Sequence, residues 1–600
     1  MADTKTVGAV LVYGNGYERF LPGIASADAD AVNELIQATS APPMSTGFPF
    51  ADEAIPSRQA LLDLLPPFRQ RDELKDIFFE VFSPLFHILH DPTFHMEYAN
   101  FCRCPGEVPL SFLALVFVIL SISVNALDSD NPLLADLGHA ASPSANIKSL
   151  ATKYRSAAMR CLSADQFLWR HNLHTVQALV LLIYAISHAH GPSWALLGTT
   201  FHICVSLGCH IDPSQLNLDP VRSEQRRRCW AGLMLLYTIQ NTILGNLAPM
   251  KLNESASVRF PADIDDEDIS LGGSLQRYAE GTDTRPPTKM SYILLKIKLY
   301  SLASEICQFA RDGRDISTLH ELERRITAEE HLHEARFADG QQLPTYHVAH
   351  NYILNNYIHY LRLILHRPYL HAYGSSSGRG ITHPSEQVLQ SRAHCTTAAL
   401  VLLSNHEDLC CDVRFKPYRW FVYSLGSFQA FLAASTLRVL LASDDGLTDA
   451  HRAQFLGAIQ KCELRFEDMA ARSDVCSKAA PILRRLLQHL PTGPPALVHQ
   501  TSSASDESEM CSIKDGYTSI SHPTSMAGFP QPGLSYDGPA VKADSSWFNC
   551  PPQMYELMAL PPEQWLGGAS TLAWDWRGWV EVEPYMNVPE TFGAGPGVMM

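Results

Sequence analysis

Apolar residues recur every three or four positions along most of this 600-residue chain, from about Leu61 to about Leu490. That spacing places apolar side chains on one face of a helix, so it predicts helices that bury this face against one another. Stretches that alternate between polar and apolar residues, as strands do, are few. The pattern predicts an all-α fold of packed helices, with helices over residues 72–89 (interrupted near Pro84), 175–189, 192–208, 224–245, 291–311, 346–366, 387–404, 419–442 and 452–471.

The composition changes on both sides of this helical region. Residues 1–58 are mixed in polarity and rich in small residues, whereas residues 491–600 are rich in Pro, Gly and Ser. Such segments bury too little apolar surface to offset the entropy of ordering a chain, so we expect disorder at both ends. The predicted organisation is an N-terminal segment and linker at 1–58, one large multi-helix domain at 59–490 and a low-complexity tail at 491–600.

The C-terminal tail combines acidic residues with tryptophans. After residue 500 it has twelve acidic residues against three basic ones, and it holds five of the nine tryptophans, among them Trp565, Trp574, Trp576 and Trp579. Acids interleaved with aromatic side chains are typical of segments that dock into a hydrophobic groove on a partner. The alternative is a tail that packs across its own domain through these tryptophans, and the sequence leaves both open.

Composition narrows the class of protein further. A formal net charge of -16 argues against tight binding of the whole chain to a nucleic-acid backbone. The 14 cysteines are scattered, often in apolar runs, which suits reduced and buried thiols. The start of the chain lacks the pattern of a secretory signal. The most apolar stretch, Leu110–Leu127, contains Ser111, Ser121, Ser123 and Asn125, so we expect a buried core helix and no membrane span.

Two polar clusters are candidate sites of chemistry. The acidic run Asp263–Asp268 could bind magnesium or act as an acid, and an all-α enzyme is the alternative class that it would serve. We favour an acidic loop that pairs with nearby arginines, because no second acidic cluster of suitable spacing accompanies it. His87, His90 and His95 lack the spacing of a closed tetrahedral zinc site. The sequence therefore predicts no catalytic, cofactor or metal site.

The arginine run Arg226–Arg228 opens a helix that is apolar on every side, which predicts a buried helix. A helix expected to start at Ser223 would place these cations in its first turn, where the helix dipole disfavours them by about 0.3–1 kcal/mol each. A buried helix cannot lay an exposed face in a DNA groove. We predict that at least one arginine forms a bidentate pair with a carboxylate of the flanking acidic stretches, which contain Asp212, Asp219 and Asp263–Asp268.

In this order and spacing, the motifs resemble the middle homology region of fungal-specific transcription factors. In that family a Trp-x-x-x-Gly helix ends in Leu-Gly-x-His, a Glu-x-Arg-Arg-Arg-x-Trp helix and a Pro-x-Asp-x-Asp segment follow, and a Leu-His-Arg-Pro helix lies downstream. The resemblance implies structural roles for the matching residues, which are Trp194, Gly198, Gly208, His210, Glu224, Arg226, Arg227, Arg228, Trp230, Pro261, Asp263, Asp265, His366, Arg367 and Pro368.

The chain departs from the family pattern in three respects, one of which is that Gly245, Asn246 and Leu247 stand where the family usually has Gly-Arg-Pro. Tyr237 and Thr238 stand where the family usually has Asp-Arg, so one internal ion pair is missing or replaced. The family normally begins with a zinc cluster of six cysteines that reads DNA, whereas no cysteine precedes Cys102 here. Zinc is expected in the family, but its ligands are absent from this chain, so we expect no cofactor. Either the gene prediction starts late or the DNA reader has been lost.

The resemblance implies a regulator of transcription that acts in the nucleus, in a specific metabolic or secondary-metabolite pathway, and is not an enzyme. The helical region would be a regulatory domain that restrains the tail or senses a small-molecule effector. The tail, with its four named tryptophans, would recruit the transcription machinery. DNA contact is expected to be weak or indirect, through a DNA-binding partner protein, and a homodimer or heterodimer is open. A co-regulator in a heteromer that does not itself bind DNA is a further alternative.

Overall fold

The fold was derived from a computed structural model, which describes residues 8–12, 16–22, 56–188, 193–216, 218–243, 258–269, 286–312, 315–337, 343–370, 386–443 and 447–488. Within these ranges nearly all regular structure is helical, which confirms the predicted all-α class. The tail at 491–600 and its tryptophans lie outside the described residues.

A short β-hairpin precedes the helices. Strands β1 (Gly8–Val12) and β2 (Glu18–Pro22) pair antiparallel, and the Glu18 backbone N–H donates to the carbonyl of His171 at 2.8 Å. The inward side chains Ala9 and Leu11 are buried. The prediction of a disordered N-terminal segment is therefore wrong for this hairpin. Five-residue strands are too short to stand out by alternation, and their pairing depends on contacts with the helical domain.

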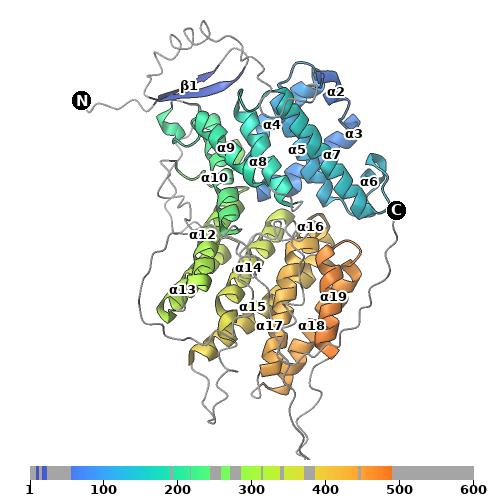
Figure 1. Cartoon of the computed structure of the whole chain (residues 1–600), viewed down its shortest axis with the longest axis vertical. Coiled ribbons are helices and arrows are strands. Elements are labelled where there is room, and N and C mark those ends of the chain that lie inside the picture. Colours follow the sequence, from blue (N-terminus) through green and yellow to red (C-terminus); the bar gives the residue numbers. More distant parts are fainter. Residues whose placement is uncertain are drawn as a thin grey trace, which may run out of the picture.

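The helices up to α10 make up the upper part of the molecule in Figure 1, next to the hairpin. They are α2 (Arg58–Leu62), α3 (Phe68–Ile77), the π-helix η2 (Phe78–Phe82), the 3₁₀-helix η3 (Ser83–Leu85), α4 (Asp91–Arg103), α5 (Leu110–Ser123), η4 (Val124–Ala126), α6 (Pro132–Leu137), α7 (Pro143–Ala164), α8 (Leu173–His188), α9 (Trp194–Ser206), η5 (Pro213–Gln215) and α10 (Pro220–Ile243).

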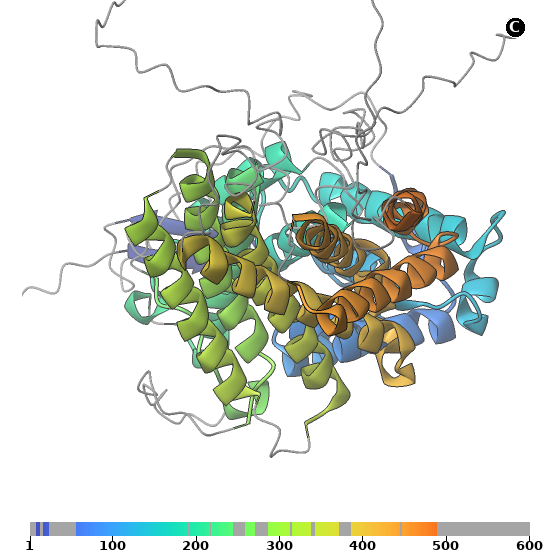
Figure 2. The same cartoon turned by 90° about the horizontal axis from the view of Figure 1, so that it is seen from below.

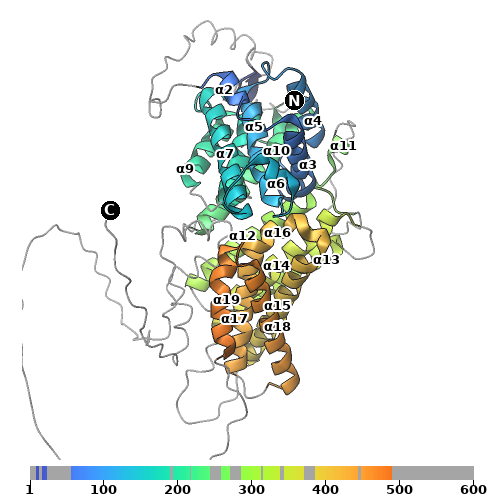
Figure 3. The same ribbon diagram turned by 90° about the vertical axis from the view of Figure 1, so that its right-hand side faces the viewer.

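The later helices make up the lower part, and the views of Figures 1 and 3 agree on this division. Seen from below, they follow one another across the molecule in chain order (Figure 2). After the short α11 (Asp266–Ile269) they are α12 (Ser291–Asp312), α13 (Ile316–Arg336), α14 (Thr345–His366), η6 (Arg367–Tyr369), α15 (Glu386–Cys411), η8 (Val413–Tyr418), α16 (Arg419–Phe421), the π-helix η9 (Val422–Gly426), α17 (Ser427–Ser443), α18 (Asp449–Met469) and α19 (Asp474–Gln488).

The predicted helices are present, with ends that differ by a few residues, and the predicted break near Pro84 coincides with η3. Helices that the sequence pattern did not reveal include α4, α7, α13 and α19. Helix α13 shows why such a helix is hard to predict from the sequence. Its buried apolar residues are only Leu319, Leu322 and Ile326, and many of its other residues are charged. So narrow an apolar stripe is a weak periodic signal.

Helix α5 forms the centre of the upper part and packs against α7 and α8. Every residue from Ser111 to Ser123 is buried, which confirms the predicted core helix. Its polar side chains find partners inside the protein: Ser121 donates to the carbonyl of Ala151 at 2.9 Å. A longer helical stretch, Val413–Leu441, is apolar enough by length and composition to cross a membrane, but 89% of its most apolar window is buried inside the protein.

A glycine on α10 allows close packing between α10 and the segment that follows η3. A Cβ added to Gly232 would lie 2.8 Å from Ile88 Cγ2 and 3.1 Å from Phe86 Cζ. We expect Gly232→Val to lower the free energy of unfolding by about 1–3 kcal/mol through overpacking, measured by urea unfolding followed by circular dichroism.

The signature residue Gly198 on α9 is the matched control, because a Cβ there would meet nothing within 4 Å. Gly198→Ala is expected to be neutral or to stabilise by up to about 1 kcal/mol, since alanine favours helix. Equal losses in the two variants would contradict this difference in packing.

Candidate functional site

The arginine run lies in the second turn of α10. The helix begins at Pro220, one turn earlier than predicted, and Asp219 caps it by accepting from the Arg222 backbone N–H at 2.9 Å. Proline suits the first helical position because its missing N–H would have no helical partner there. The guanidinium groups are buried as expected, with Arg226 and Arg228 each 1% exposed. Such deeply buried cations must be paired.

Two of the arginines use the acidic stretches that the sequence singled out. Arg227 donates to both carboxylate oxygens of Asp212, at 2.9 and 3.4 Å. Arg228 Nη1 donates to Asp266 Oδ1 at 2.7 Å and to the carbonyl of Leu89 at 2.8 Å. The prediction of carboxylate pairs, one of them bidentate, is therefore confirmed.

The third pair was not foreseen. Arg226 donates to Glu18 on strand β2, whose other oxygen accepts from Arg222. Arg226 also donates to the carbonyl of Leu207 at 2.7 Å. A single glutamate 208 residues away along the chain carries no local signal of this pairing. The contact fastens the hairpin to the start of α10.

The signature glycine Gly208 contributes to the same attachment. It follows α9 with a φ of 77°, a conformation that glycine adopts at little cost. A Cβ at this position would lie 2.9 Å from Phe20 of β2. Next to it, the His210 ring contacts Phe20 and Trp230, with centroids 5.9 and 6.5 Å apart. Gly208 and His210 thus form part of the surface that receives the hairpin.

The signature tryptophans of α9 and α10 are linked through Phe201 and Tyr237. Trp194 packs on Tyr237, with ring centroids 5.9 Å apart, and Phe201 contacts both Tyr237 and Trp230. Thr238 donates to the carbonyl of Met234 at 2.9 Å. Where the family usually carries Asp-Arg, this chain therefore has an aromatic contact and a hydroxyl bonded to its own helix.

The acidic loop before α12 is held in place by hydrogen bonds and ion pairs with α10, α12 and α13. Glu224 accepts from the Ala262 backbone N–H at 2.9 Å, beside buried Pro261. Asp263 accepts from Arg336 at 2.7 Å and from Ser291 at 2.8 Å. Burial raises the pKa of the half-buried Asp265 carboxyl. Apart from the exposed Glu267 and Asp268, the acidic side chains of this run are buried or half-buried.

Asp266 is the most connected carboxylate of the loop. Besides Arg228, Oδ1 lies 3.1 Å from His87 Nε2, and Oδ2 accepts from the Asp91 backbone N–H at 2.7 Å. Burial would raise its pKa, but the contacts with His87, Arg228 and Asp91 outweigh burial and hold that pKa well below the usual range. In the same way, hydrogen bonds to Asp212, above all the one from Arg227, outweigh the effect of burial and lower the pKa of Asp212.

His87, Asp91 and Asp266 lie close enough to share a metal ion. Two cations already occupy this cluster, because Arg228 pairs with Asp266 and Lys289 donates to Asp91 at 2.7 Å. We interpret the cluster as a network of ion pairs that joins the segment between η3 and α4, helices α4 and α10, and the acidic loop.

The His-Arg-Pro motif lies in a second network, on the lower helices. His366 Nε2 is 3.0 Å from Glu323 Oε2, and Arg362 donates to Glu323 Oε1 at 2.8 Å. His394 completes a second group of potential metal ligands. Its ring stacks on that of His366 at 17°, so the in-plane lone pairs of the two rings do not converge on one ion. Arg367 and Pro368 continue into η6.

Several histidines on the lower helices are buried and hard to protonate. Burial lowers the pKa of His406 to about 4, with Arg465 a smaller cause. In the unfolded chain a histidine takes up its proton near pH 6.5, whereas buried His406 does so only near pH 4. The free energy of unfolding is therefore unaffected by His406 above about pH 6.5 and decreases as the pH falls from there toward 4. Burial likewise lowers the pKa values of His333, His347 and His359 to about 4.

We expect His406→Gln to weaken this pH dependence. Between pH 7 and pH 5 the free energy of unfolding of the variant should fall by about 2 kcal/mol less than that of the wild type. Urea unfolding at both pH values measures the difference. The exposed His451 on α18 provides the control, and His451→Gln should keep the wild-type slope. An unchanged slope in His406→Gln would show that this histidine does not limit stability in acid.

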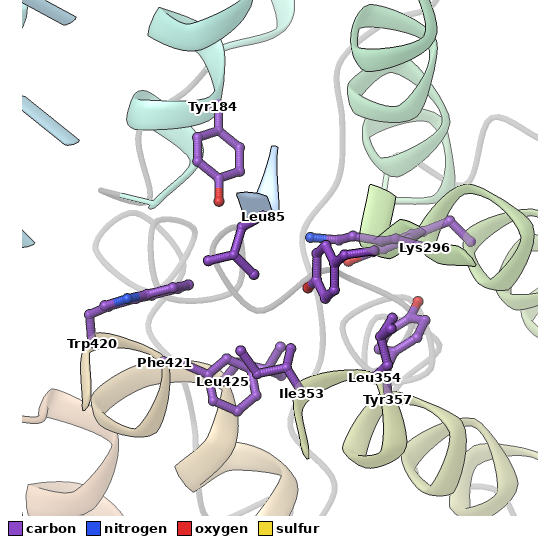
Figure 4. Close-up of a pocket in the computed structure, with 11 residues that line it drawn as sticks. Leu85, Tyr184, Lys296, Ile353, Leu354, Tyr357, Trp420, Phe421 and Leu425 are labelled. Carbon is purple, nitrogen blue, oxygen red and sulfur yellow. The ribbon is translucent and has the colours of Figure 1, made fainter. Parts of the chain in front are cut away.

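A pocket opens between the upper and lower parts of the molecule. Figure 4 shows Tyr184 of α8 and Leu85 of η3 above it, Lys296 of α12 beside it, and side chains of α14, α16 and η9 below. The volume of the pocket, including its opening to solvent, is about 440 Å³. Most of this space is too narrow to admit a water molecule. The lining is formed by Leu85, Tyr184, Tyr292, Lys296, Tyr300, Ile353, Leu354, Tyr357, Trp420, Phe421 and Leu425.

Sequence reasoning did not find this pocket, because its lining comes from separate helices. The one local signal is on α12, where Tyr292, Lys296 and Tyr300 follow one another at four-residue spacing and so share a helix face. Within the part of the chain that the structure describes, no acidic residue lines the pocket. The carboxylates of the acidic run therefore do not line this pocket, contrary to what the enzyme alternative would favour.

Comparison with known proteins finds similarity over the part of the chain that contains the arginine run. Residues 76–334, which include the arginine run and its partners Asp212 and Asp266, match the family model of the fungal specific transcription factor domain. A transcriptional regulatory protein of Schizosaccharomyces pombe is 24% identical over 387 residues, which are 63% of this chain and 57% of its own length.

Two further relatives are cluster or zinc-type regulators by name. The Zn(2)-C6 fungal-type transcription factor mpsB of Macrophomina phaseolina is 24% identical over 372 residues, 59% of this chain and 46% of its own. The equisetin cluster transcription factor eqxF of Fusarium heterosporum is 23% identical over 466 residues, 72% of this chain and 62% of its own. The chain thus spans about half of the length of the curated relatives that it matches.

Proposed function

We propose that this chain regulates transcription in the nucleus, for a secondary-metabolite or other metabolic gene cluster, because residues 76–334 match the family model of the fungal specific transcription factor domain. The match to that domain is the observation that carries the proposal. Its relatives are transcription regulators, and several are named for such clusters. The helical domain would modulate transcription, and the acidic tail with Trp565, Trp574, Trp576 and Trp579 would recruit the transcription machinery or a partner protein.

We further propose that this chain contacts DNA weakly or through a DNA-binding partner. The most conspicuous basic run is buried and paired with carboxylates, so it offers no charge to a phosphate backbone. The formal net charge of -16 also opposes binding to DNA. A gel-shift assay with the purified chain should show no tight, sequence-specific complex, and such a complex would overturn this part of the proposal.

An enzymatic role is the less favoured alternative. Within the acidic run, Asp263 and Asp266 are held by arginines and hydroxyl or backbone groups of the fold. The Asp266 carboxylate is a poor general acid, because its hydrogen bonds and the neighbouring Arg228 stabilise its charged form. We therefore propose that the run fastens the loop and takes no part in catalysis.

The role of the tail is testable by fusing the chain to a heterologous DNA-binding domain and measuring a reporter gene. We expect the fusion to change expression, because the assay supplies the DNA contact. Replacing the four tail tryptophans by alanine should weaken the effect at least fivefold. Replacing Ser502, Ser503, Ser505 and Ser508 by alanine is the matched control. A full effect without the tryptophans would show that the tail does not recruit the machinery, and a silent wild-type fusion would contradict the proposed function.

A further inference from the structure

The pocket between the two parts of the molecule has a distinct chemistry. More than half of its lining side chains are aromatic, among them Tyr184, Tyr357 and Trp420, and its one charged lining residue among those that the structure describes is Lys296. Small-molecule sites are typically apolar and aromatic, with a few polar groups that fix the orientation of the ligand. Aromatic walls of this kind favour a flat ligand, because ring faces stack on one another.

Lys296 is positioned by the helix face that it shares with two tyrosines. Its ammonium nitrogen lies 5.5 Å from the ring centroid of Tyr292 and 5.7 Å from that of Tyr300, within the range of cation–π attraction. Lys296 is half-buried, and among the residues that the structure describes no acidic side chain lines the same space. An anionic group of a ligand would find its complement there.

The backbone around the pocket is irregular on both sides. Leu85 lies in η3, directly after the π-helix η2, and Leu425 lies in the π-helix η9. π-Helical turns are rare and frequently occur at functional sites. The two irregular segments belong to the upper and the lower part, so they form opposite walls of the pocket (Figure 4).

We propose that this pocket binds a flat, aromatic small molecule that carries one anionic group, with Lys296 as its counterion. The proposal rests on the proposed function, since the molecule would act as an effector of transcription. Its ring system would stack among the tyrosines and Trp420, and its anionic group would accept hydrogen bonds from the Lys296 ammonium group. Entry requires the lining side chains to move apart, because the pocket is narrow in this conformation.

The pocket is connected to the ion-pair network through α12. Ser291, at the start of this helix, donates to Asp263 of the acidic loop, and Arg336 pairs with the same carboxylate. Lys289, two residues before α12, donates to Asp91 on α4. A ligand that shifts α12 would therefore act on residues that join the upper and lower parts.

Binding can be tested with two probes that differ in charge, 2-naphthoate and its uncharged methyl ester. The full-length chain is titrated with each probe, and heat release and tryptophan fluorescence are recorded. We expect Lys296→Met to weaken the binding of 2-naphthoate at least tenfold and that of the ester less than twofold. Lys296→Arg, which keeps the charge, should retain binding of 2-naphthoate within threefold. Lys298→Met, on the exposed face of the same helix, should bind both probes like the wild type.

A pocket-filling variant locates the probe independently of charge. Leu354→Trp should abolish the binding of both probes, while an unchanged unfolding midpoint shows that the variant is folded. Failure of the wild type to bind 2-naphthoate, or wild-type affinity in Lys296→Met, would overturn the proposed site. Neither result bears on the reporter fusion described above, so failure of the pocket and failure of the proposed function are distinguishable.

Discussion

Asp266→Asn is expected to lower the free energy of unfolding by about 3–5 kcal/mol, the usual loss when one partner of a buried ion pair is removed. Asp266 is 2% exposed, and its carboxylate accepts from Arg228 and from the Asp91 backbone N–H. The neutral amide leaves the buried Arg228 without its closest counter-charge. Glu224, whose Oε1 lies 3.5 Å from Arg228 Nε, offsets only part of the loss.

Urea unfolding followed by circular dichroism measures this loss. The exposed Asp268, two residues further along the same loop, provides the control, and Asp268→Asn should change stability by no more than about 0.5 kcal/mol. The double variant Arg228→Met with Asp266→Asn should lose less than the sum of the two single variants, because it removes both members of the pair. A loss below about 1 kcal/mol in Asp266→Asn would mean that Glu224 suffices for Arg228.

Glu18→Gln is expected to release the N-terminal hairpin from the domain. The glutamate is the carboxylate partner of Arg226, which is 1% exposed. Without its charge, the described partners of this buried guanidinium are all neutral: the carbonyl of Leu207, the thiol of Cys209 and the amide oxygen of the new glutamine. We expect a local loss of about 3 kcal/mol, the lower end of the range for a broken buried pair. That loss corresponds to a roughly hundredfold rise in the opening of the hairpin.

Hydrogen exchange of peptides that cover residues 8–22 and 205–230 reports this opening directly. The variant should exchange faster in these two regions and remain protected in the lower helices. Arg19→Gln changes an exposed charge on the same strand and should leave the exchange rates unchanged. Uniformly faster exchange along the whole chain would instead indicate a global loss of stability, and unchanged exchange in Glu18→Gln would contradict the anchoring role of the pair.

The two predictions together assign the arginine run a role in assembly. Arg226 fastens the hairpin, Arg227 holds Asp212 in the turn before α10, and Arg228 holds the loop that leads to α12. A DNA-binding surface would leave these cations exposed. In this fold, three consecutive side chains on one helix bring together segments from three different places in the chain.

The sequence by itself determined the helical class, the positions of most long helices, and the burial of the arginine run. Each follows from a local pattern: apolar periodicity predicts a helix and its buried face, and a buried cation requires a carboxylate. The acidic stretches beside Arg227 and Arg228 were therefore recognisable as partners. The family resemblance depended in the same way on short motifs in a fixed order.

Only the tertiary structure decided the partner of Arg226, the docking of the hairpin and the aromatic pocket. Glu18 stands 208 residues before Arg226, and no periodicity links positions so far apart. Helix α13 escaped prediction because its apolar stripe is narrow, and the pocket because its walls come from separate helices. Local patterns fix which side chains must be buried, whereas the choice among distant partners is made by packing, when the helices bring their faces together.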